Sequence, residues 1–148
     1  MKKIIFGLSL FILVAVFGYI QIFGLLEFNG VRPDFLLSLL LLALFFRSGY
    51  FLFLSLLLFS SALLSFKPGF SPELLVFISL LLVLFFFRRH VSIEKPASFI
   101  FIVIFSTFLF YALAGFSFLF SHPGIIFLEA FLNAAFGWLS LVILKNLA

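Results

Sequence analysis

Apolar residues fill six segments of the chain, and Pro, Gly and charged residues gather in the short stretches between them. Because Pro and Gly interrupt regular structure, we interpret these stretches as loops. We therefore predict an all-α protein, a compact bundle of six helices. The helices are expected over residues 4–26, 34–46, 50–64, 72–87, 97–120 and 124–147.

The six segments differ in length, and length decides whether a helix can cross a bilayer. The first, fifth and sixth comfortably span a hydrocarbon core of about 30 Å. The second, third and fourth are short, and the stretch from Pro33 to Ser48 would reach only about 24 Å. Crossing would then require snorkelling of Arg47 or local thinning of the bilayer. The alternative is a re-entrant hairpin of the second and third segments, although loops in lipid leave backbone groups unbonded.

The composition indicates that lipid is the solvent for most side chains. Of the 148 residues, 66% are hydrophobic and 9% are charged. A soluble domain is nearer to about half apolar and about a quarter charged. We therefore predict an integral membrane protein with a single polytopic domain over residues 1–148. The absence of cysteine excludes disulfides, thiolate metal sites and thiol nucleophiles.

The basic residues predict the orientation in the membrane. With a cytoplasmic N-terminus, one group lies inside and a much smaller one outside, as the positive-inside rule requires. The inner group is Lys2, Lys3, Arg47, Arg88, Arg89, Lys95 and Lys145, and the outer group is Arg32 and Lys67. We expect a multi-pass protein of the bacterial cytoplasmic membrane with both termini cytoplasmic. Because these charges sit at the ends of apolar runs, they are topology signals, and no nucleic-acid partner is predicted.

Two further stretches lie at the predicted membrane boundaries. The N-terminal apolar run is longer than that of a signal peptide, so we predict that it is the first span. The inner loop over residues 88–96 is the most charged loop. We interpret this loop as a topological anchor in contact with anionic lipid, with docking to a cytoplasmic partner as the alternative.

The turn before the second segment carries two opposite charges and a proline, in the order Arg32, Pro33, Asp34. Proline suits the first turn of a helix, because its missing N–H would have no helical partner there. A carboxylate beside it is favoured by the positive end of the helix dipole. We therefore predict that these residues turn the chain and begin the second helix.

A polar stripe runs along the sixth segment, where Glu129, Asn133 and Gly137 recur at every fourth position. Residues at this spacing share one helix face. A carboxylate and an amide facing lipid would be costly, so the stripe is predicted to face protein. Arg32 and Lys67 are the outer cations that could pair with Glu129. The stripe is either a structural polar seam within the chain or a docking surface for another membrane protein's helix.

The chain offers few groups for catalysis. His90 and His122 are predicted on opposite sides of the membrane, so they cannot share a metal ion. Only one predicted span contains a carboxylate well inside it, and no nucleophile–base pair accompanies it. The serines that end the third segment are interpreted as helix-packing residues. We predict no enzymatic activity, no cofactor and no metal site.

Three pieces of sequence resemble the rod shape-determining protein MreD family. The first is a Pro-Asp entry into a leucine-rich span, the second an apolar span ending in two arginines, and the third a last helix with a basic, leucine-rich tail. They are residues 32–40, residues 72–77 running to Arg88 and Arg89, and residues 131–134 with 144–147. The stretch from Tyr50 to Ser65 departs from the family pattern, because it contains serines and no aspartate.

The resemblance implies a non-enzymatic membrane scaffold of the bacterial cell-elongation machinery. Members of the family associate with the membrane-anchored protein MreC. Through it they are linked to the polymerase RodA, its partner transpeptidase and the actin-like MreB. The resemblance also implies a six-transmembrane-helix fold like that of the substrate-binding subunits of vitamin transporters.

The alternative function is a small-molecule-binding subunit of an energy-coupling-factor vitamin transporter. This class has a similar size and number of spans. It commonly carries an Ala-x-x-x-Ala pattern in its first helix, whereas here Ala15 has Phe11 and Tyr19 at those offsets. The scaffold is therefore the leading prediction.

Overall fold

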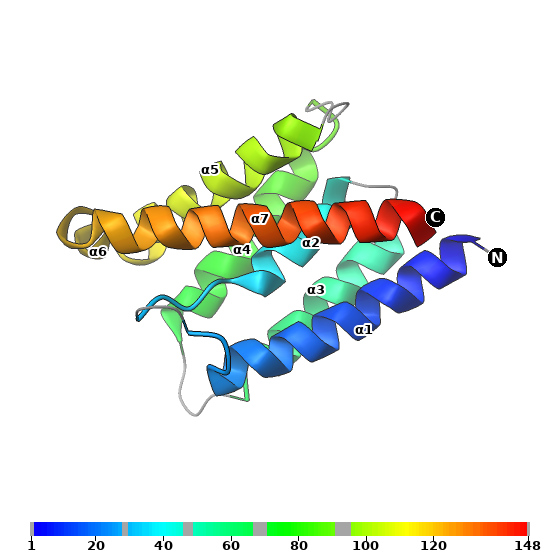
Figure 1. Ribbon diagram of the computed structural model, residues 1–148, viewed down its shortest axis with the longest axis horizontal. Coiled ribbons are helices and arrows are strands. Elements are labelled where there is room, and N and C mark those ends of the chain that lie inside the picture. Colours follow the sequence, from blue (N-terminus) through cyan, green and yellow to red (C-terminus); the bar gives the residue numbers. More distant parts are fainter. Residues whose placement is uncertain (1, 28–29, 46–48, 67–70, 91–95, 148) are drawn as a thin grey trace.

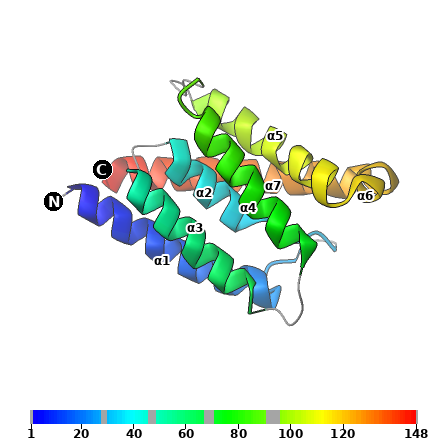
Figure 2. The same cartoon turned by 180° about the vertical axis from the view of Figure 1, so that it is seen from behind.

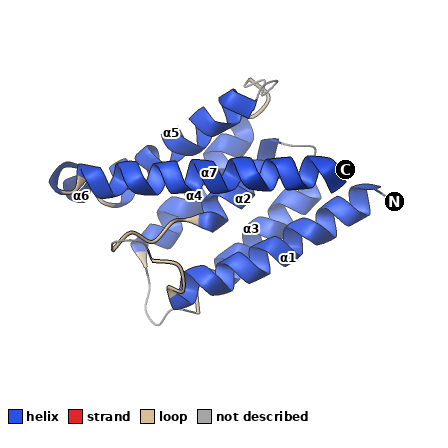
Figure 3. Cartoon of the chain, in the orientation of Figure 1, coloured by secondary structure: helices blue, strands red, loops and turns tan. Residues whose placement is uncertain are grey.

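The computed structural model describes residues 2–27, 30–45, 49–66, 71–90 and 96–147 of the chain. In these ranges the protein consists of seven helices and contains no β-strand (Figures 1 and 3). The helices are α1 (Lys2–Phe23), α2 (Phe35–Phe45), α3 (Tyr50–Leu64), α4 (Pro72–Phe87), α5 (Pro96–Ala114), α6 (Phe116–Ser121) and α7 (Pro123–Leu147). The prediction of an all-helical chain is confirmed, and α3 and α4 have the predicted bounds.

The predicted single helix over residues 97–120 is wrong, because the structure divides it into α5 and α6. The break lies at Gly115, which leaves the helical region with φ −154° and ψ 62°. The Gly115 N–H still closes the last turn of α5 on the Tyr111 carbonyl oxygen, and its own carbonyl starts α6. Apolar residues continue on both sides of Gly115, so this single glycine was not interpreted as a loop.

The first helix also ends earlier than residue 26, the predicted limit. It stops at Phe23 and is followed by Gly24 at φ +62°. A left-handed glycine after the last helical residue is a common helix terminus, since other residues adopt this conformation at a cost. Leu25 and Leu26 therefore belong to the turn that leads toward α2.

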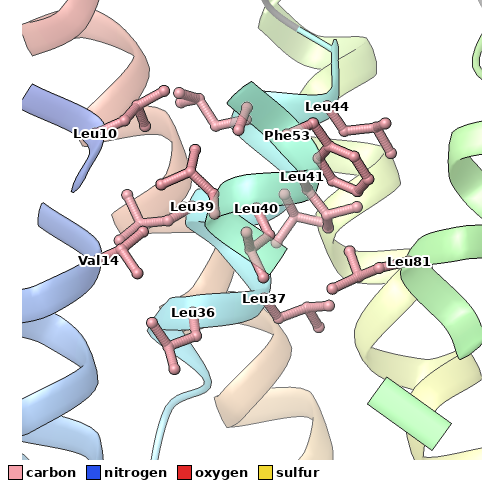
Figure 4. Close-up of a cluster of buried hydrophobic side chains, with 14 of the residues drawn as sticks. Leu10, Val14, Leu36, Leu37, Leu39, Leu40, Leu41, Leu44, Phe53 and Leu81 are labelled. Atoms are coloured by element: carbon pink, nitrogen blue, oxygen red, sulfur yellow. The ribbon is translucent and has the colours of Figure 1, made fainter. Parts of the chain in front are cut away.

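Helix α2 lies at the centre of the bundle and is buried on every side. All ten residues from Phe35 to Leu44 are buried, and α2 packs against α1, α3, α4, α5 and α7. Figure 4 shows its leucines directed toward Leu10 of α1, Phe53 of α3 and Leu81 of α4. A helix that is apolar around its whole circumference is expected to be enclosed in this way.

Successive long helices run in opposite directions around α2, so the connections gather at two ends (Figure 1). We call them the turn end, with the α1–α2 turn and α6, and the terminal end, with the start of α1 and the end of α7. Helices α1 and α7 form one side of the molecule, and α3 and α4 form the opposite side (Figure 2).

Among the described residues, three helical stretches are long and apolar enough to cross a membrane: Ile4–Phe23, Pro96–Ala114 and Pro123–Asn146. The other apolar helices, α2, α3 and α4, are shorter. Large apolar side chains cover the outside of the bundle, among them Phe51 with 86% and Phe66 with 78% of its surface exposed. Such a surface suits lipid rather than water as its surroundings.

Candidate functional site

The start of α2 is closed by the side chain of Asp34. Its Oδ1 accepts a hydrogen bond from the N–H of Leu37 at 3.0 Å. This is the geometry of a helix N-cap, in which a carboxylate binds a backbone donor that the helix leaves unpaired. Asp34 thus lies at the positive end of the helix dipole, as predicted. Pro33 precedes the cap and does not occupy the first turn, because α2 begins at Phe35.

A glutamine from α1 fastens the same helix start. Gln21 donates through Nε2 to Oδ1 of Asp34 at 3.0 Å, and its Oε1 accepts from the N–H of Leu36 at 3.2 Å. One amide therefore binds both the capping residue and a free backbone donor of α2. Gln21 was not among the predicted site residues. The available signal was an amide inside an otherwise apolar run, where lipid exposure would be costly.

The predicted partner of Arg32 was Glu129, and the structure pairs Arg32 differently. Its Nε lies 2.8 Å from Oε2 of Glu27, and both side chains are substantially exposed. The guanidinium also lies over Gly24, where an added Cβ would be 3.3 Å from its Cζ. Glu27 belongs to the same turn as Arg32, so this ion pair forms locally. Lys67, the other candidate, lies outside the described residues, as do Arg47 and Lys95.

Glu129 is 4% exposed and accepts a hydrogen bond from the Tyr111 hydroxyl at 2.5 Å. One helical turn further along α7, Asn133 is fully buried and donates to Oγ1 of Thr107 at 3.2 Å. Both partners come from α5. The polar stripe of α7 therefore faces another helix of the same chain over its first two positions.

The third position of the stripe allows close packing. A Cβ added at Gly137 would be 3.2 Å from the Phe99 ring of α5 and 3.6 Å from Cβ of Ser38 in α2. Ser38 also donates to the backbone carbonyl of Asn133 at 2.9 Å. Helices α2, α5 and α7 thus meet along this stripe.

A cavity of about 220 Å³ opens at the turn end, beside the start of α2. Its polar lining combines three carboxyl groups with one guanidinium, an amide and two hydroxyls, and its apolar lining includes two phenylalanines. The lining residues are Gln21, Arg32, Asp34, Leu64, Ser71, Glu73, Leu74, Phe77, Phe110, Tyr111 and Glu129. Asp34 and Glu129 already accept hydrogen bonds from the protein, and Glu73 accepts one from Ser71.

The other end of α2 is closed by Arg88, the residue that follows α4. Nη1 of Arg88 makes a long hydrogen bond of 3.5 Å to the carbonyl oxygen of Leu44. The same guanidinium lies 4.2 Å from the ring centroid of Tyr50 and 4.9 Å from that of Phe85. Arg89 donates to the Tyr50 hydroxyl at 2.8 Å. The two arginines, predicted as anchors, therefore also hold the ends of α2, α3 and α4 together.

The histidines lie at opposite ends of the bundle. His122 follows α6 at the turn end, where its ring stacks on Phe118 with centroids 4.8 Å apart. His90 follows α4 at the terminal end. In the part of the chain that the structure describes, no group of three or more His, Asp or Glu side chains is placed to hold a metal ion.

Comparisons of the chain with protein-family models, with curated proteins and with solved structures gave no match.

Proposed function

We propose that the protein is a non-enzymatic membrane scaffold of the bacterial cell-elongation machinery, of the kind represented by the MreD family. Its partner would be MreC and, through MreC, RodA with its transpeptidase and MreB. The proposal is supported by the sequence resemblance over residues 32–40 and in the fourth and sixth segments. It is also supported by the helical, apolar bundle.

One observation carries most weight, namely that polar side chains inside the bundle bind one another across helices. Gln21 binds Asp34, Tyr111 binds Glu129, and Asn133 binds Thr107. Each contact joins residues from two different parts of the bundle. The contacts of Glu129 and Asn133 give a buried polar group a partner, as apolar surroundings require. This use of polar groups suits a rigid body that presents its surface to partners.

The proposed arrangement has six crossings with the terminal end in the cytoplasm. The alternating direction of the long helices supports it, because each connection reverses the chain and the next helix carries it back to the opposite end (Figure 1). A chain without cysteine allows a direct test. After His122→Cys, an impermeant thiol reagent should label intact cells, and after His90→Cys it should label only permeabilised cells. The reverse pattern would refute this orientation.

The scaffold function is tested by partner capture and by cell shape. Affinity-tagged protein, extracted from its own cells in mild detergent, should retain MreC. A tagged six-helix vitamin-transporter subunit, expressed at the same level, is the control and should retain none. Depletion of the protein should turn rod-shaped cells round. Absence of MreC from the captured material, together with unchanged cell shape, would contradict the proposal.

The cavity at the turn end favours the second candidate, a small-molecule-binding subunit of a vitamin transporter. Its three carboxyl groups outnumber the single guanidinium, so its lining suits a cation. Thiamine is a suitable cationic vitamin as a probe, with binding measured by equilibrium dialysis of the purified protein. Under this alternative Glu73→Gln should weaken binding, whereas Glu27→Gln, outside the cavity, should not. Absence of thiamine binding would leave the scaffold as the better account.

A further inference from the structure

The two sides of the bundle differ in the height of their apolar surface. On one side, the apolar spans of α1 and α7 have 20 and 24 residues, which corresponds to about 30 Å and about 36 Å of helix. On the opposite side, α3 has 15 residues and α4 has 16, or about 22 Å and about 24 Å. Only the first side matches a hydrocarbon core of about 30 Å. A tilt of α3 or α4 would reduce their reach further.

The polar groups at the terminal end of α4 are fixed in place. Arg88 reaches inward to the Leu44 carbonyl and stacks on Tyr50, and Arg89 is bound to the Tyr50 hydroxyl. Long basic side chains often extend away from a short span to reach water, which relieves such a mismatch. Here both arginines are engaged by the protein, so this relief would break the contacts that close α2.

Polar side chains also lie at the other end of α4, at the turn end of the bundle. Ser71 precedes α4 and donates to the Glu73 carboxylate in its first turn, and Glu73 lines the cavity. Between the polar groups at its two ends, α4 is apolar from Leu74 to Phe87 except for Ser79, a stretch of about 21 Å. The apolar height of this side is therefore set by polar groups at both of its edges.

Lipid is the expected neighbour of this side. Its most exposed residues are bulky: Phe51 and Leu58 on α3, Phe66 just after α3, and Phe86 and Phe87 at the end of α4. Membrane helices that pack on one another prefer small residues, which allow their backbones to approach closely. Fluid acyl chains adapt to large side chains without that requirement.

We propose that the α3–α4 side of the protein contacts a locally thinned bilayer, while the α1–α7 side contacts bilayer of ordinary thickness. The interaction surface is the exposed face of α3 and α4, and its partner is lipid whose hydrocarbon region is reduced to about 20–24 Å. The inference rests on the proposed crossing of the membrane by α3 and α4. It adds that the protein deforms the bilayer on one side only.

Nitroxide depth measurements test the proposal in vesicles of dioleoyl phosphatidylcholine. Single spin labels are attached after Leu75→Cys or Phe86→Cys on α4, with Phe127→Cys and Ile143→Cys on α7 as the matched pair. All four side chains are exposed. Along their helices, the α4 pair is about 8 Å closer together than the α7 pair. In a flat bilayer the α4 labels would therefore lie about 4 Å deeper than the α7 labels.

The expected result is that the α4 labels lie no deeper than the α7 labels, because the lipid surface follows the polar edges of α4. Labels that are deeper by about 4 Å would overturn the thinning. If neither oxygen nor an aqueous nickel reagent reaches the α4 labels, protein covers this side of the bundle. That result would also overturn the proposal.

A separate labelling experiment distinguishes failure of the crossing from failure of the thinning. Cysteines introduced by Ser65→Cys and His90→Cys should react with an impermeant reagent from opposite sides of the vesicle. Reaction from the same side would refute both the crossing and the inference. Reaction from opposite sides, combined with deep α4 labels, would refute the thinning and leave the proposed crossing intact.

Discussion

The two ends of α2 are closed by different chemistry. At the turn end, Asp34, the residue just before α2, caps the helix, and the Gln21 side chain of α1 adds a second acceptor. At the terminal end, Arg88, which directly follows α4, donates to the Leu44 carbonyl oxygen while its guanidinium lies on the Tyr50 ring. Acceptors and negative charge thus meet the N-terminus of α2, and donors and positive charge meet its C-terminus.

The difference follows from what each helix end lacks. A helix leaves backbone N–H groups unpaired at its start and carbonyl groups unpaired at its end. In water the solvent would bind both, but α2 is enclosed by protein on all sides. The surrounding protein must therefore supply an acceptor at the start of α2 and a donor at its end. The same arrangement places negative charge at the positive end of the helix dipole and positive charge at its negative end.

The largest effect is expected at the turn end. Asp34→Ala removes the cap of α2 and leaves the Gln21 amide without its acceptor, so the free energy of unfolding should fall by about 2 kcal/mol. Thermal unfolding in detergent measures it. Asp34→Asn, which keeps an acceptor oxygen, should lose clearly less. Equal losses for the two variants would show that the charge matters rather than the hydrogen bonds.

A somewhat smaller effect is expected for Glu129→Ala. The substitution leaves the partly buried Tyr111 hydroxyl without its acceptor, which should cost about 1–2 kcal/mol. The same unfolding assay measures it in the isolated protein, without any partner. Tyr111→Phe removes the same hydrogen bond and is the matched variant. If Glu129→Ala leaves stability unchanged but abolishes MreC capture, the polar stripe is a docking surface and not an internal seam.

At the terminal end, Arg88→Leu should lower the unfolding free energy by about 1 kcal/mol, because a stacked cation and a carbonyl partner are lost. Arg88→Lys should recover little of this, since an ammonium group cannot reproduce the planar stacking. Arg89→Leu provides the control, because Arg89 is exposed and binds only the edge of this cluster. A loss for Arg89→Leu as large as that for Arg88→Leu would argue against a special role of Arg88.

The smallest effect is expected for the ion pair of the α1–α2 turn. Arg32 and Glu27 are 59% and 39% exposed, and such pairs contribute about 0–1 kcal/mol. Arg32→Ala should therefore shift unfolding slightly at low salt and not at all at high salt. A large loss that persists at high salt would mean that Arg32 supports the neighbouring cavity rather than this exposed pair.

The sequence was sufficient where a glycine or a polar residue bordered each end of an apolar helix. Gly49 and Ser65 flank α3, Ser71 and Arg88 flank α4, and both helices have the predicted bounds. It was insufficient at Gly115, because a single glycine in a uniformly apolar run can either continue a helix or end it. Tertiary contacts decide between these outcomes, and a pattern of apolar residues does not encode them.

In the candidate site, too, the sequence predicted which residues share a helix face but not which residues they contact. The spacing of Glu129 and Asn133 predicted a shared face, and the structure places both toward α5. The pattern could not identify Tyr111 as the partner, because a tyrosine among phenylalanines differs from them by one hydroxyl. It also offered Arg32 as a partner for Glu129, whereas the structure pairs Arg32 with Glu27. The course of the turn, which brings Glu27 within 2.8 Å, was not predictable from charge alone.

The central place of α2 has a consequence for how the protein is made. Ser38 of α2 bonds the Asn133 carbonyl of α7, 95 positions later in the chain. The ribosome therefore delivers α2 long before the helix that completes its surroundings. In that interval, lipid or the insertion machinery must shelter a leucine-rich helix that the finished protein encloses. Assembly of this bundle is therefore a late event, which depends on the arrival of α7.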